Sequence, residues 1–392
     1  MRKVVLGVCG SVAAYRAADL ARELMRAGCS VRVCLTDSAQ KFVTPALFEA
    51  LTGNPCLIDT FEEPEVGRMV HIDWAREADL VVVAPATANT INKIAAGFAD
   101  DLLTTMLLAY DGPLVVAPAM NPTMYQNETV QASLRQLVER GVFVIEPTEG
   151  DVACGENGQG KLASVGHLAQ DVNSIMSRTQ ILAGMSVLIT SGPTQEPMDD
   201  VRYLSNRSSG KMGAALARAA LLLGANVTVI TGPTAVSLPL AATVIRVNTA
   251  EEMLTAAQAN LAAKDWIIGA AAVADYRPAK PFAGKMRRSS DDLTIELAPN
   301  PDIIATLAKL ANPKQRVVGF AAEPTGDTSI AREKIQRKGL YAIAANDVSR
   351  MDIGFGADQN ELVLIRADGS SSSSGTRSKL QVALWLFEEL VG

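Results

Sequence analysis

Short apolar runs alternate with segments of helical periodicity along almost the whole chain. In the first half, the apolar runs occupy positions 4–8, 31–35, 80–83, 114–117 and 142–145. Uninterrupted apolar runs of this length are typical of strands buried on both faces of a parallel sheet. A helical pattern over 13–27 ends at Gly28, a residue suited to the left-handed conformation that closes helices. We therefore predict a doubly wound α/β domain.

The same alternation begins again after a predicted helical linker at 167–178. Further strands are predicted at 185–190, 226–230, 266–269, 317–320, 342–344 and 362–365, with a helix at 212–223. We place the domain boundary near residue 180, so the fold prediction is two Rossmann-like, doubly wound parallel-sheet domains, 1–180 and 181–392. We expect the serine tract 369–375 to be a flexible turn and the helix 379–390 to pack back onto the second domain.

Composition adds little to the fold, but it excludes several classes of protein. At 392 residues the chain is too long for one ordinary core, and 48% hydrophobic with 20% charged residues is a globular composition. The net charge of −6, without a basic stripe, argues against nucleic-acid binding. No apolar run reaches the ~18–20 residues of a membrane span and no signal-peptide pattern is present, so we expect a cytoplasmic protein with no membrane partner.

The five cysteines form no CxxC pair and the chain has only two histidines, which disfavours a structural zinc site and is typical of a reducing compartment. Four of the cysteines lie in or beside apolar elements and are predicted to be small core residues: Cys9, Cys29, Cys34 and Cys56. Cys154 lies instead in a glycine-rich stretch that we expect to be an exposed, mobile loop. A thiol there could act as nucleophile or proton donor.

The clearest candidate for a ligand contact is Asn121, which lies between Pro118 and Pro122 just after the strand predicted at 114–117. The two prolines prevent the sheet from continuing, so Asn121 is held at the carboxyl end of the strand, where open α/β sheets bind ligands. Its side chain offers an amide donor and a carbonyl acceptor. His71, one of the two histidines, is a second candidate because imidazole titrates near neutral pH.

Small and hydroxyl-bearing residues follow three other predicted strands. They are Gly10, Ser11, Thr36, Ser38, Ala86, Thr87 and Asn89. A dinucleotide fingerprint beginning at Gly7 would need glycine where the chain has Cys9 and Val12, so an NAD site is not indicated. Each hydroxyl alone could serve only as a helix cap. Together they favour an anionic cofactor such as flavin mononucleotide (FMN).

Residues 1 to about 175 resemble the homo-oligomeric flavin-containing cysteine decarboxylases. The shared features are His71, the Pro-Ala-Thr-Ala-Asn-Thr run at 85–90, the Pro-Ala-Met-Asn-x-x-Met run around Asn121, and the glycine loop of Cys154. The resemblance implies that FMN oxidises the thiol of a C-terminal cysteine residue, that the resulting thioaldehyde loses its carboxylate, and that the ene-thiolate is then reduced. It implies that His71 is the base, that Asn121 holds the carboxylate and that Cys154 protonates the intermediate.

In the second half, the stretch 205–212 leads into a predicted helix and looks like a phosphate loop. A Walker motif would need Gly and then Ser or Thr where the chain has Ser205 and Met212, so that motif is not present. An anion could still lie at the N-terminus of this helix. Asp275 could hold Mg²⁺, and the basic run 285–288 suits contacts to a triphosphate.

Residues from about 183 to 350 resemble phosphopantothenate–cysteine ligases, and the two halves together resemble the bifunctional coenzyme A biosynthesis family of bacteria. The resemblance implies that CTP activates the pantothenate carboxylate as an acyl-cytidylate, releasing pyrophosphate, and that the amine of cysteine then displaces CMP. Decarboxylation would follow and yield 4′-phosphopantetheine. By the same resemblance, Lys285 would neutralise charge in the first step and Asn206 would hold the acyl-cytidylate. The implied nucleotide site comprises Ala271, Ala272, Val273, Asp275, Lys285, Pro301, Asp302, Ile303, Ile304, Phe320, Lys334 and Lys338.

The sequence departs from both family patterns at a few positions that keep their chemical type. Thr87 and Tyr125 stand where serine and tryptophan are usual, and the arginines at 287–288 stand where lysines are common. We expect these residues to alter the packing and the hydrogen-bond geometry of the basic side chains rather than to abolish activity. The resemblance further implies a homo-oligomer, a dodecamer in which decarboxylase trimers are joined by ligase dimers, with small molecules as the other partners.

Two alternative functions fit the sequence less well. A flavin prenyltransferase-like transferase fused to a nucleotide-binding domain would have no ene-thiolate for Cys154 to protonate. A flavin-binding regulatory subunit without activity would be expected to lack Asn121 or Cys154, and this chain has both.

Overall fold

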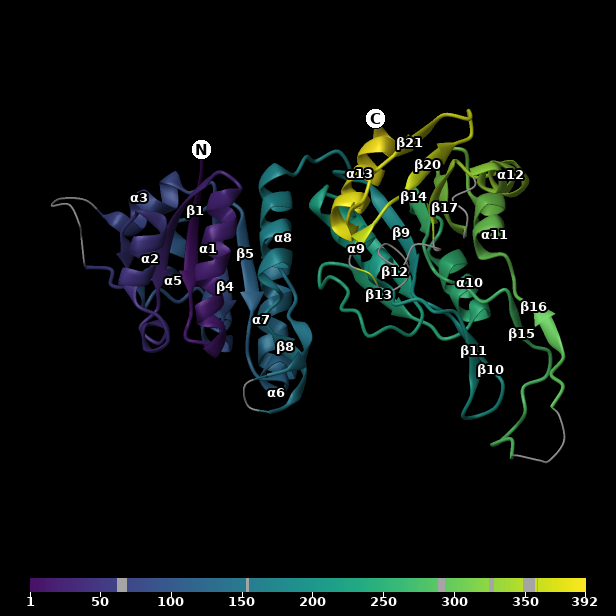
Figure 1. Cartoon of the computed structure of the whole chain (residues 1–392), viewed down its shortest axis with the longest axis horizontal. Coiled ribbons are helices and arrows are strands. Elements are labelled where there is room, and N and C mark those ends of the chain that lie inside the picture. Colours follow the sequence, from purple (N-terminus) through teal and green to yellow (C-terminus); the bar gives the residue numbers. More distant parts are fainter. Residues whose placement is uncertain (62–68, 153–154, 288–292, 324–327, 348–356, 358) are drawn as a thin grey trace. The chain divides into compact units, whose positions relative to one another are not determined.

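The computed structural model describes the chain except for residues 62–68, 153–154, 288–292, 324–327, 348–356 and 358. Backbone contacts divide the chain into two compact units (Figure 1). The first comprises Met1–Arg178 with the short segment Pro239–Ala241, and the second comprises Thr179–Leu238 with Ala242–Gly392.

The first unit is built on a six-stranded sheet whose paired strands all run parallel. In spatial order the strands are β3 (Cys56–Leu57), β2 (Cys29–Leu35), β1 (Arg2–Val8), β4 (Leu80–Ala86), β5 (Leu114–Pro118) and β6 (Phe143–Val144). This is the Rossmann order, and the direction of winding reverses between β1 and β4. The predicted fold class is confirmed, and the reversal puts a crevice at the carboxyl ends of β1 and β4.

Helices cover both faces of this sheet because each apolar strand must be buried on two sides. They are η1 (Val12–Tyr15), α1 (Arg16–Arg26), η2 (Ala39–Lys41), α2 (Pro45–Thr52), α3 (Val70–Glu77), α4 (Ala88–Ala96), α5 (Leu102–Leu108), α6 (Pro122–Gln126), α7 (Glu128–Glu139) and α8 (Val165–Ser177). The helix predicted at 13–27 begins as the 3₁₀ turn η1, which Ser11 caps. Gly28, at φ +85°, follows its end as expected.

The second unit contains an eight-stranded sheet. Its spatial order is β13 (Thr243–Arg246), β12 (Asn226–Thr231), β9 (Ser186–Ser191), β14 (Trp266–Gly269), β17 (Arg316–Glu323), β18 (Ala342–Asp347), β20 (Val363–Arg366) and β21 (Ser371–Ser373). The strands from β13 to β18 run parallel, and winding reverses between β9 and β14. The edge pairs β18–β20 and β20–β21 are antiparallel.

Two details of the second sheet correct the sequence prediction. The sheet is mixed rather than wholly parallel, and part of the serine tract is the edge strand β21 rather than a flexible turn. The backbone of β21 pairs with the apolar strand β20, while Ser371 and Ser373 keep exposed side chains. Only one side of an edge strand needs a partner, so polar residues suffice there.

Among its described residues, the second unit also contains five helices and three two-stranded antiparallel ribbons. The helices are α9 (Lys211–Leu222), α10 (Ala250–Ala259), α11 (Ile303–Leu310), α12 (Thr328–Lys338) and α13 (Lys379–Val391). The ribbons pair β10 (Gln195–Pro197) with β11 (Tyr203–Ser205), β15 (Tyr276–Pro278) with β16 (Leu297–Pro299), and β19 (Gln359–Asn360) with β22 (Arg377–Ser378), and the first two are hairpins. The first two hairpins extend away from the sheet of this unit (Figure 1). As predicted, the last helix packs on the second domain, against α9.

The four cysteines predicted to be core residues are buried free thiols, whereas Cys154 falls outside the described residues. Burial raises the pKa of the Cys9 thiol to about 11 and that of Cys56 to about 12. Among the described residues, no helix combines the length and the apolar character needed to span a bilayer.

The raised pKa values predict slow alkylation of these thiols in the folded protein. At a pH of about 8, near the ordinary thiol pKa of about 8.5, Cys9 and Cys56 stay almost wholly protonated, and the thiolate is the reactive form. Mass mapping after brief iodoacetamide treatment should find both unmodified in native protein and modified in urea. Modification of either thiol at equal rates in both conditions would contradict the buried placement.

Candidate active sites

Asn121 is fixed by the helix that follows it. It is the N-cap of α6, and its Oδ1 accepts hydrogen bonds from the backbone N–H groups of Thr123 (2.8 Å) and Met124 (3.4 Å). Pro122 occupies the first position of that helix, where its missing N–H costs nothing. With Oδ1 committed to the helix, the amide nitrogen is the end of the side chain that could donate to a carboxylate.

A β-hairpin lies directly against this segment. Strands β7 (Thr148–Asp151) and β8 (Asn157–Lys161) are antiparallel, and Met120 donates its N–H to the carbonyl of Gly160 at 3.0 Å. A Cβ on Gly160 would lie 2.4 Å from the Met120 carbonyl oxygen, and one on Gly158 would lie 2.9 Å from Cβ of Pro122. The prediction of a mobile glycine loop is therefore wrong for 157–161, because these glycines serve close backbone approach rather than loop freedom.

Gly160→Ala should accordingly disturb the backbone of the Asn121 segment without replacing any candidate catalytic side chain. The added methyl would meet the Met120 carbonyl, so we expect the variant to lose about 1–3 kcal/mol of unfolding free energy, measured by thermal or urea denaturation. Gly166→Ala, on α8 with nothing within 4 Å of the new Cβ, is the matched control and should be neutral or slightly stabilising. Equal stabilities for the two variants would contradict the packing described.

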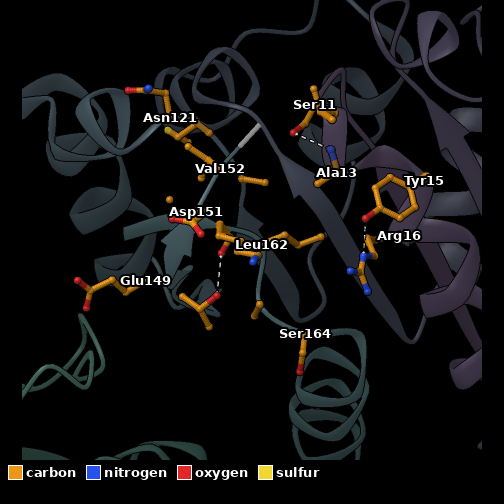
Figure 2. A pocket seen from close by; sticks show the side chains of 17 residues that line it. Ser11, Ala13, Tyr15, Arg16, Asn121, Glu149, Asp151, Val152, Leu162 and Ser164 are labelled. Atoms are coloured by element: carbon orange, nitrogen blue, oxygen red, sulfur yellow. Dashed lines mark hydrogen bonds between the residues drawn. The ribbon is translucent and has the colours of Figure 1, made fainter. Parts of the chain in front are cut away.

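The hairpin, the Asn121 segment and the first turns after β1 enclose a cavity of about 810 Å³, a size typical of small-molecule sites. Figure 2 shows the Ser11–Arg16 segment on one side of it and Asn121 with the hairpin residues on the other. The lining comprises Ser11, Val12, Ala13, Tyr15, Arg16, Ala119, Met120, Asn121, Thr148, Glu149, Asp151, Val152, Gly160, Lys161, Leu162, Ala163 and Ser164. The cavity thus brings together two predicted site residues, Ser11 and Asn121.

The other predicted flavin contacts lie at the neighbouring strand ends and do not line this cavity. Thr36 and Ser38 follow β2, and a Cβ on Gly10 would lie only 2.3 Å from Cβ of Ser38, so the loops after β1 and β2 touch. Thr87 follows β4 and caps α4, accepting from the Thr90 N–H. Ala86 is buried at the end of β4, whereas Asn89 is exposed on α4. Hydroxyls and amides at a reversal of strand order fit a phosphorylated cofactor.

His71 lies on α3 and is absent from the cavity lining. Its ring nitrogen Nδ1 is buried, and no hydrogen-bond partner for it is found in the part of the chain that the structure describes. Buried polar atoms without partners are uncommon and call for an explanation, such as a group supplied by a ligand or another chain.

In the second unit, Asn206 joins two strand-end loops. It follows β11, and its Nδ2 donates to the carbonyls of Ala272 (3.3 Å) and Val273 (2.9 Å). The 270–273 loop is itself held at the end of β9, because Ala272 donates its N–H to the Gly192 carbonyl at 2.9 Å. Asn206 is therefore anchored at the point where the strand order of this sheet reverses.

A second cavity, of about 130 Å³, opens beside this anchor. Its lining comprises residues 208–213 and 270–272 with Phe320, Ala322, Asn346, Asn360 and Lys379. Gly210, at φ +77°, is the N-cap of α9 and provides no side-chain cap. The N–H of Lys211 donates to the Ser209 hydroxyl (3.4 Å), and the N–H groups after it suit an anionic ligand. The buried Ser191 hydroxyl packs against Gly213 and has no hydrogen-bond partner among the described residues.

Both halves of the chain match known families. A family model described as "Flavoprotein" matches residues 1–177, and one described as "DNA/pantothenate metabolism flavoprotein C-terminal domain" matches 182–392. The coenzyme A biosynthesis bifunctional protein CoaBC of Escherichia coli (strain K12) is 42% identical over 395 residues, which is 100% of this chain and 97% of that protein. The CoaBC protein of Bacillus subtilis (strain 168) is 41% identical over 392 residues, covering 99% and 96%.

The chain belongs to this bifunctional family. By family and domain content it is a bifunctional enzyme of coenzyme A biosynthesis, a flavoprotein decarboxylase joined to a ligase. The resemblance inferred from the motifs is thereby confirmed, and a prenyltransferase-like transferase is not supported. The solved C-terminal domain of a CoaBC protein is 36% identical to this chain, with a TM-score of 0.47, and covers 54% of this chain and 97% of its own.

Within the family's ligase half, the structure gathers only some of the predicted nucleotide residues. Ala271, Ala272 and Phe320 line the second cavity. The loop before α11 is bonded to residues that follow the lining segment 270–272, since Asn300 donates to the carbonyls of Ala274 through its side chain (2.8 Å) and of Asp275 through its backbone N–H (2.8 Å).

The remaining predicted nucleotide residues are not gathered at the cavity. Asp302 caps α11 and forms an ion pair with Lys338 at 2.8 Å, so each already has a protein partner. Ile303 is a core residue, and the side chain of Ile304 packs against Gly269. Val273, Asp275, Lys285, Pro301 and Lys334 also lie outside the lining.

Asn360 and Lys379 also line the second cavity, and neither is a site residue that the sequence predicts. Lys379 is nearly buried, and its Nζ donates to the carbonyls of Ala357 (2.6 Å) and Gln359 (2.9 Å). The lysine at the start of this apolar helix does not by itself indicate a cavity residue, because α13 reaches the second cavity through its packing on α9.

Proposed function

We propose that this chain carries out two successive steps: CTP-dependent ligation of cysteine to 4′-phosphopantothenate, then FMN-dependent decarboxylation of 4′-phospho-N-pantothenoylcysteine to 4′-phosphopantetheine. The observation that carries the proposal is that each unit presents an anchored asparagine, Asn121 or Asn206, at the carboxyl ends of a doubly wound sheet. The order of the steps follows from the chemistry, since ligation creates the cysteinyl carboxylate that decarboxylation removes.

In ligation, a carboxylate oxygen of phosphopantothenate attacks the α-phosphorus of CTP and pyrophosphate leaves. The amine of cysteine then attacks the acyl carbon and displaces CMP. Because Nδ2 of Asn206 is committed to two backbone carbonyls, its Oδ1 is the end that could accept a hydrogen bond from the attacking amine. The N-terminus of α9 and Lys285 would complement the phosphate charge.

We assign Mg²⁺ to the triphosphate rather than to a preformed protein site. Among the described residues, no group of three His, Cys, Asp or Glu side chains is placed to hold a metal ion. Mg²⁺ is commonly bound through substrate phosphates with one or two carboxylates, and the exposed Asp275 near the second cavity is the candidate for that contact.

In decarboxylation, FMN would be held by the strand-end residues around Gly10, Ser11 and Thr87, and when bound it would supply the oxidation of the substrate thiol. Asn121 would orient the departing carboxylate by donating from its amide nitrogen, and its cap to α6 keeps it from turning away. His71 is assigned as the base and Cys154, which lies outside the described residues, as the proton donor.

We further propose that the decarboxylase site is completed by another copy of the chain in a homo-oligomer. This is supported by His71, which has an unpartnered buried Nδ1 yet does not line the cavity that Asn121 lines in its own chain. Trimers of the first domain joined by dimers of the second would give a dodecamer. We place the protein in the cytoplasm, where CTP and cysteine are available.

The proposed function is tested by supplying CTP, Mg²⁺, cysteine and 4′-phosphopantothenate to the flavin-loaded protein and following pyrophosphate and product mass. We expect pyrophosphate only when CTP and phosphopantothenate are both present, and a final product with the mass of 4′-phosphopantetheine. Pyrophosphate without that product would refute the decarboxylase half, and no pyrophosphate would refute the ligase half.

A further inference from the structure

The loop that carries Lys285 is attached to the tip of the β10–β11 hairpin. Phe282 donates its backbone N–H to the Met198 carbonyl (2.9 Å), and Asp200 donates to the Gly284 carbonyl (3.3 Å). The same hairpin continues into Asn206, so one element links the two residues assigned to ligation.

Asp199 is the centre of this attachment. Its side chain is 5% exposed, and its Oδ1 accepts from the backbone N–H groups of Val201 (2.9 Å) and Arg202 (2.7 Å), which closes the turn. Its Oδ2 accepts from the guanidinium of Arg202 and from the backbone N–H of Met286 at 3.1 Å. Arg202 in turn donates to the Met286 carbonyl at 2.9 Å.

The Asp199–Arg202 ion pair therefore binds both the backbone N–H and the carbonyl of Met286, the residue next to Lys285. A structural turn needs only the bonds to Oδ1, whereas the bonds that Asp199 and Arg202 form with Met286 span 87 and 84 positions of sequence and act on the Lys285 loop. The lysine side chain is long and flexible, so the reach of its ammonium group depends on where the backbone is fixed.

We propose that Asp199 is a positioning residue for the ligation step: through Arg202 and Met286 it fixes the backbone beside Lys285 and so places its ammonium group. This inference rests on the proposed function. In that step, the P–O bond between the α- and β-phosphates of CTP breaks as the acyl-cytidylate forms, and Lys285 neutralises the charge that develops on the departing pyrophosphate. Asp199 takes part in no bond change.

The Asp199 carboxyl group is ionised throughout the pH range in which such an enzyme works. Its hydrogen bonds with the Arg202 guanidinium hold the pKa of the Asp199 carboxyl well below its usual value. The ion pair is therefore a permanent support and not a pH switch.

Asp199→Asn is the most direct test because it keeps the hydrogen bonds that close the turn and removes those that hold Met286. The asparagine oxygen can still accept from Val201 and Arg202, but its δ2 amide group cannot accept from Met286 or from the guanidinium. In a single turnover of the full chain with 4′-phosphopantothenate and without cysteine, we expect the rate of pyrophosphate release at saturating CTP to fall about 10- to 100-fold, since misplacements near 1 Å cost this much. The CTP concentration that gives half of the maximal single-turnover rate should change less than about threefold.

A second measurement asks whether the loss acts through Lys285. In a Lys285→Gln background, Asp199→Asn should lower the rate by less than about twofold more, because a positioning residue has nothing left to position. Full additivity of the two losses would assign Asp199 a merely structural role and overturn the inference. Should the asparagine variant not fold, Arg202→Lys, which keeps the charge and loses the fork to Met286, replaces it in the same cycle.

Two controls distinguish the possible failures. Glu389→Gln removes the partner of Arg366 (2.8 Å) in the same unit, far along the chain from the Lys285 loop, and should leave pyrophosphate release unchanged. Decarboxylation by the first domain checks the amount of intact chain in each preparation, and thermal denaturation checks the folding of the second unit. A normal rate for Asp199→Asn beside an impaired Lys285→Gln refutes this inference alone, whereas a normal Lys285→Gln refutes the role proposed for Lys285 as well.

Discussion

Asn121→Ala should lower the rate of decarboxylation about 10²- to 10³-fold, the usual cost of removing one hydrogen-bond donor from a site of developing charge. The variant loses the amide that would orient the carboxylate, while the proposed flavin contacts at the ends of β1, β2 and β4 are kept. Carbon dioxide release from synthetic 4′-phospho-N-pantothenoylcysteine is the measurement. Ligation by the same chain should remain normal.

The loss of a helix cap must be separated from the loss of the carboxylate contact. Asn127 provides the control, because it caps α7 by accepting from the Thr129 N–H at 3.0 Å, much as Asn121 caps α6, and does not line the cavity. Asn127→Ala should lose about 1 kcal/mol of unfolding free energy and little activity. Similar activities for the two variants would show that Asn121 is only a cap.

Asn206→Asp should stop the ligase between its two half-reactions. Aspartate has no amide donor, and its oxygens would face the carbonyls of Ala272 and Val273 that Nδ2 of Asn206 now satisfies. The carboxylate would turn away from this anchor, so we expect amide formation to fall about 10²- to 10³-fold while the acyl-cytidylate still forms. One burst of pyrophosphate per active site should appear, with the intermediate detectable by mass.

Asn260→Asp is the matched control for this variant. Asn260 also donates to a backbone carbonyl, that of Ala256 at 2.9 Å, at the end of α10 and outside both cavities. It should turn over normally. An Asn206→Asp variant that forms the amide at the normal rate, or one that releases no pyrophosphate burst, would contradict the role assigned to Asn206.

The parts of the fold that depend on local pattern could be predicted from the sequence. Apolar runs located the parallel strands, and two prolines around Asn121 located the end of β5 and the candidate site that follows it. The serine tract was misjudged because β21 owes its order to backbone pairing with β20, a tertiary effect that polar side chains do not signal.

The candidate sites depend on contacts between distant segments, which no local pattern specifies. Gly158 and Gly160 looked like loop residues, yet they allow β8 to approach the Asn121 segment. Asn206 reaches Val273 across 67 positions, and Lys379 reaches the second cavity from the last helix. Such approaches require a particular packing of elements, so residue types alone leave them open.

The central claim, that one chain makes and then decarboxylates the cysteinyl amide, is tested most directly with cysteine labelled in its carboxyl carbon. Given CTP, Mg²⁺ and 4′-phosphopantothenate, the flavin-loaded enzyme should release labelled carbon dioxide in step with pyrophosphate, one to one, and none when CTP is omitted. Labelled carbon dioxide without CTP, or pyrophosphate with all label retained in the product, would contradict the account.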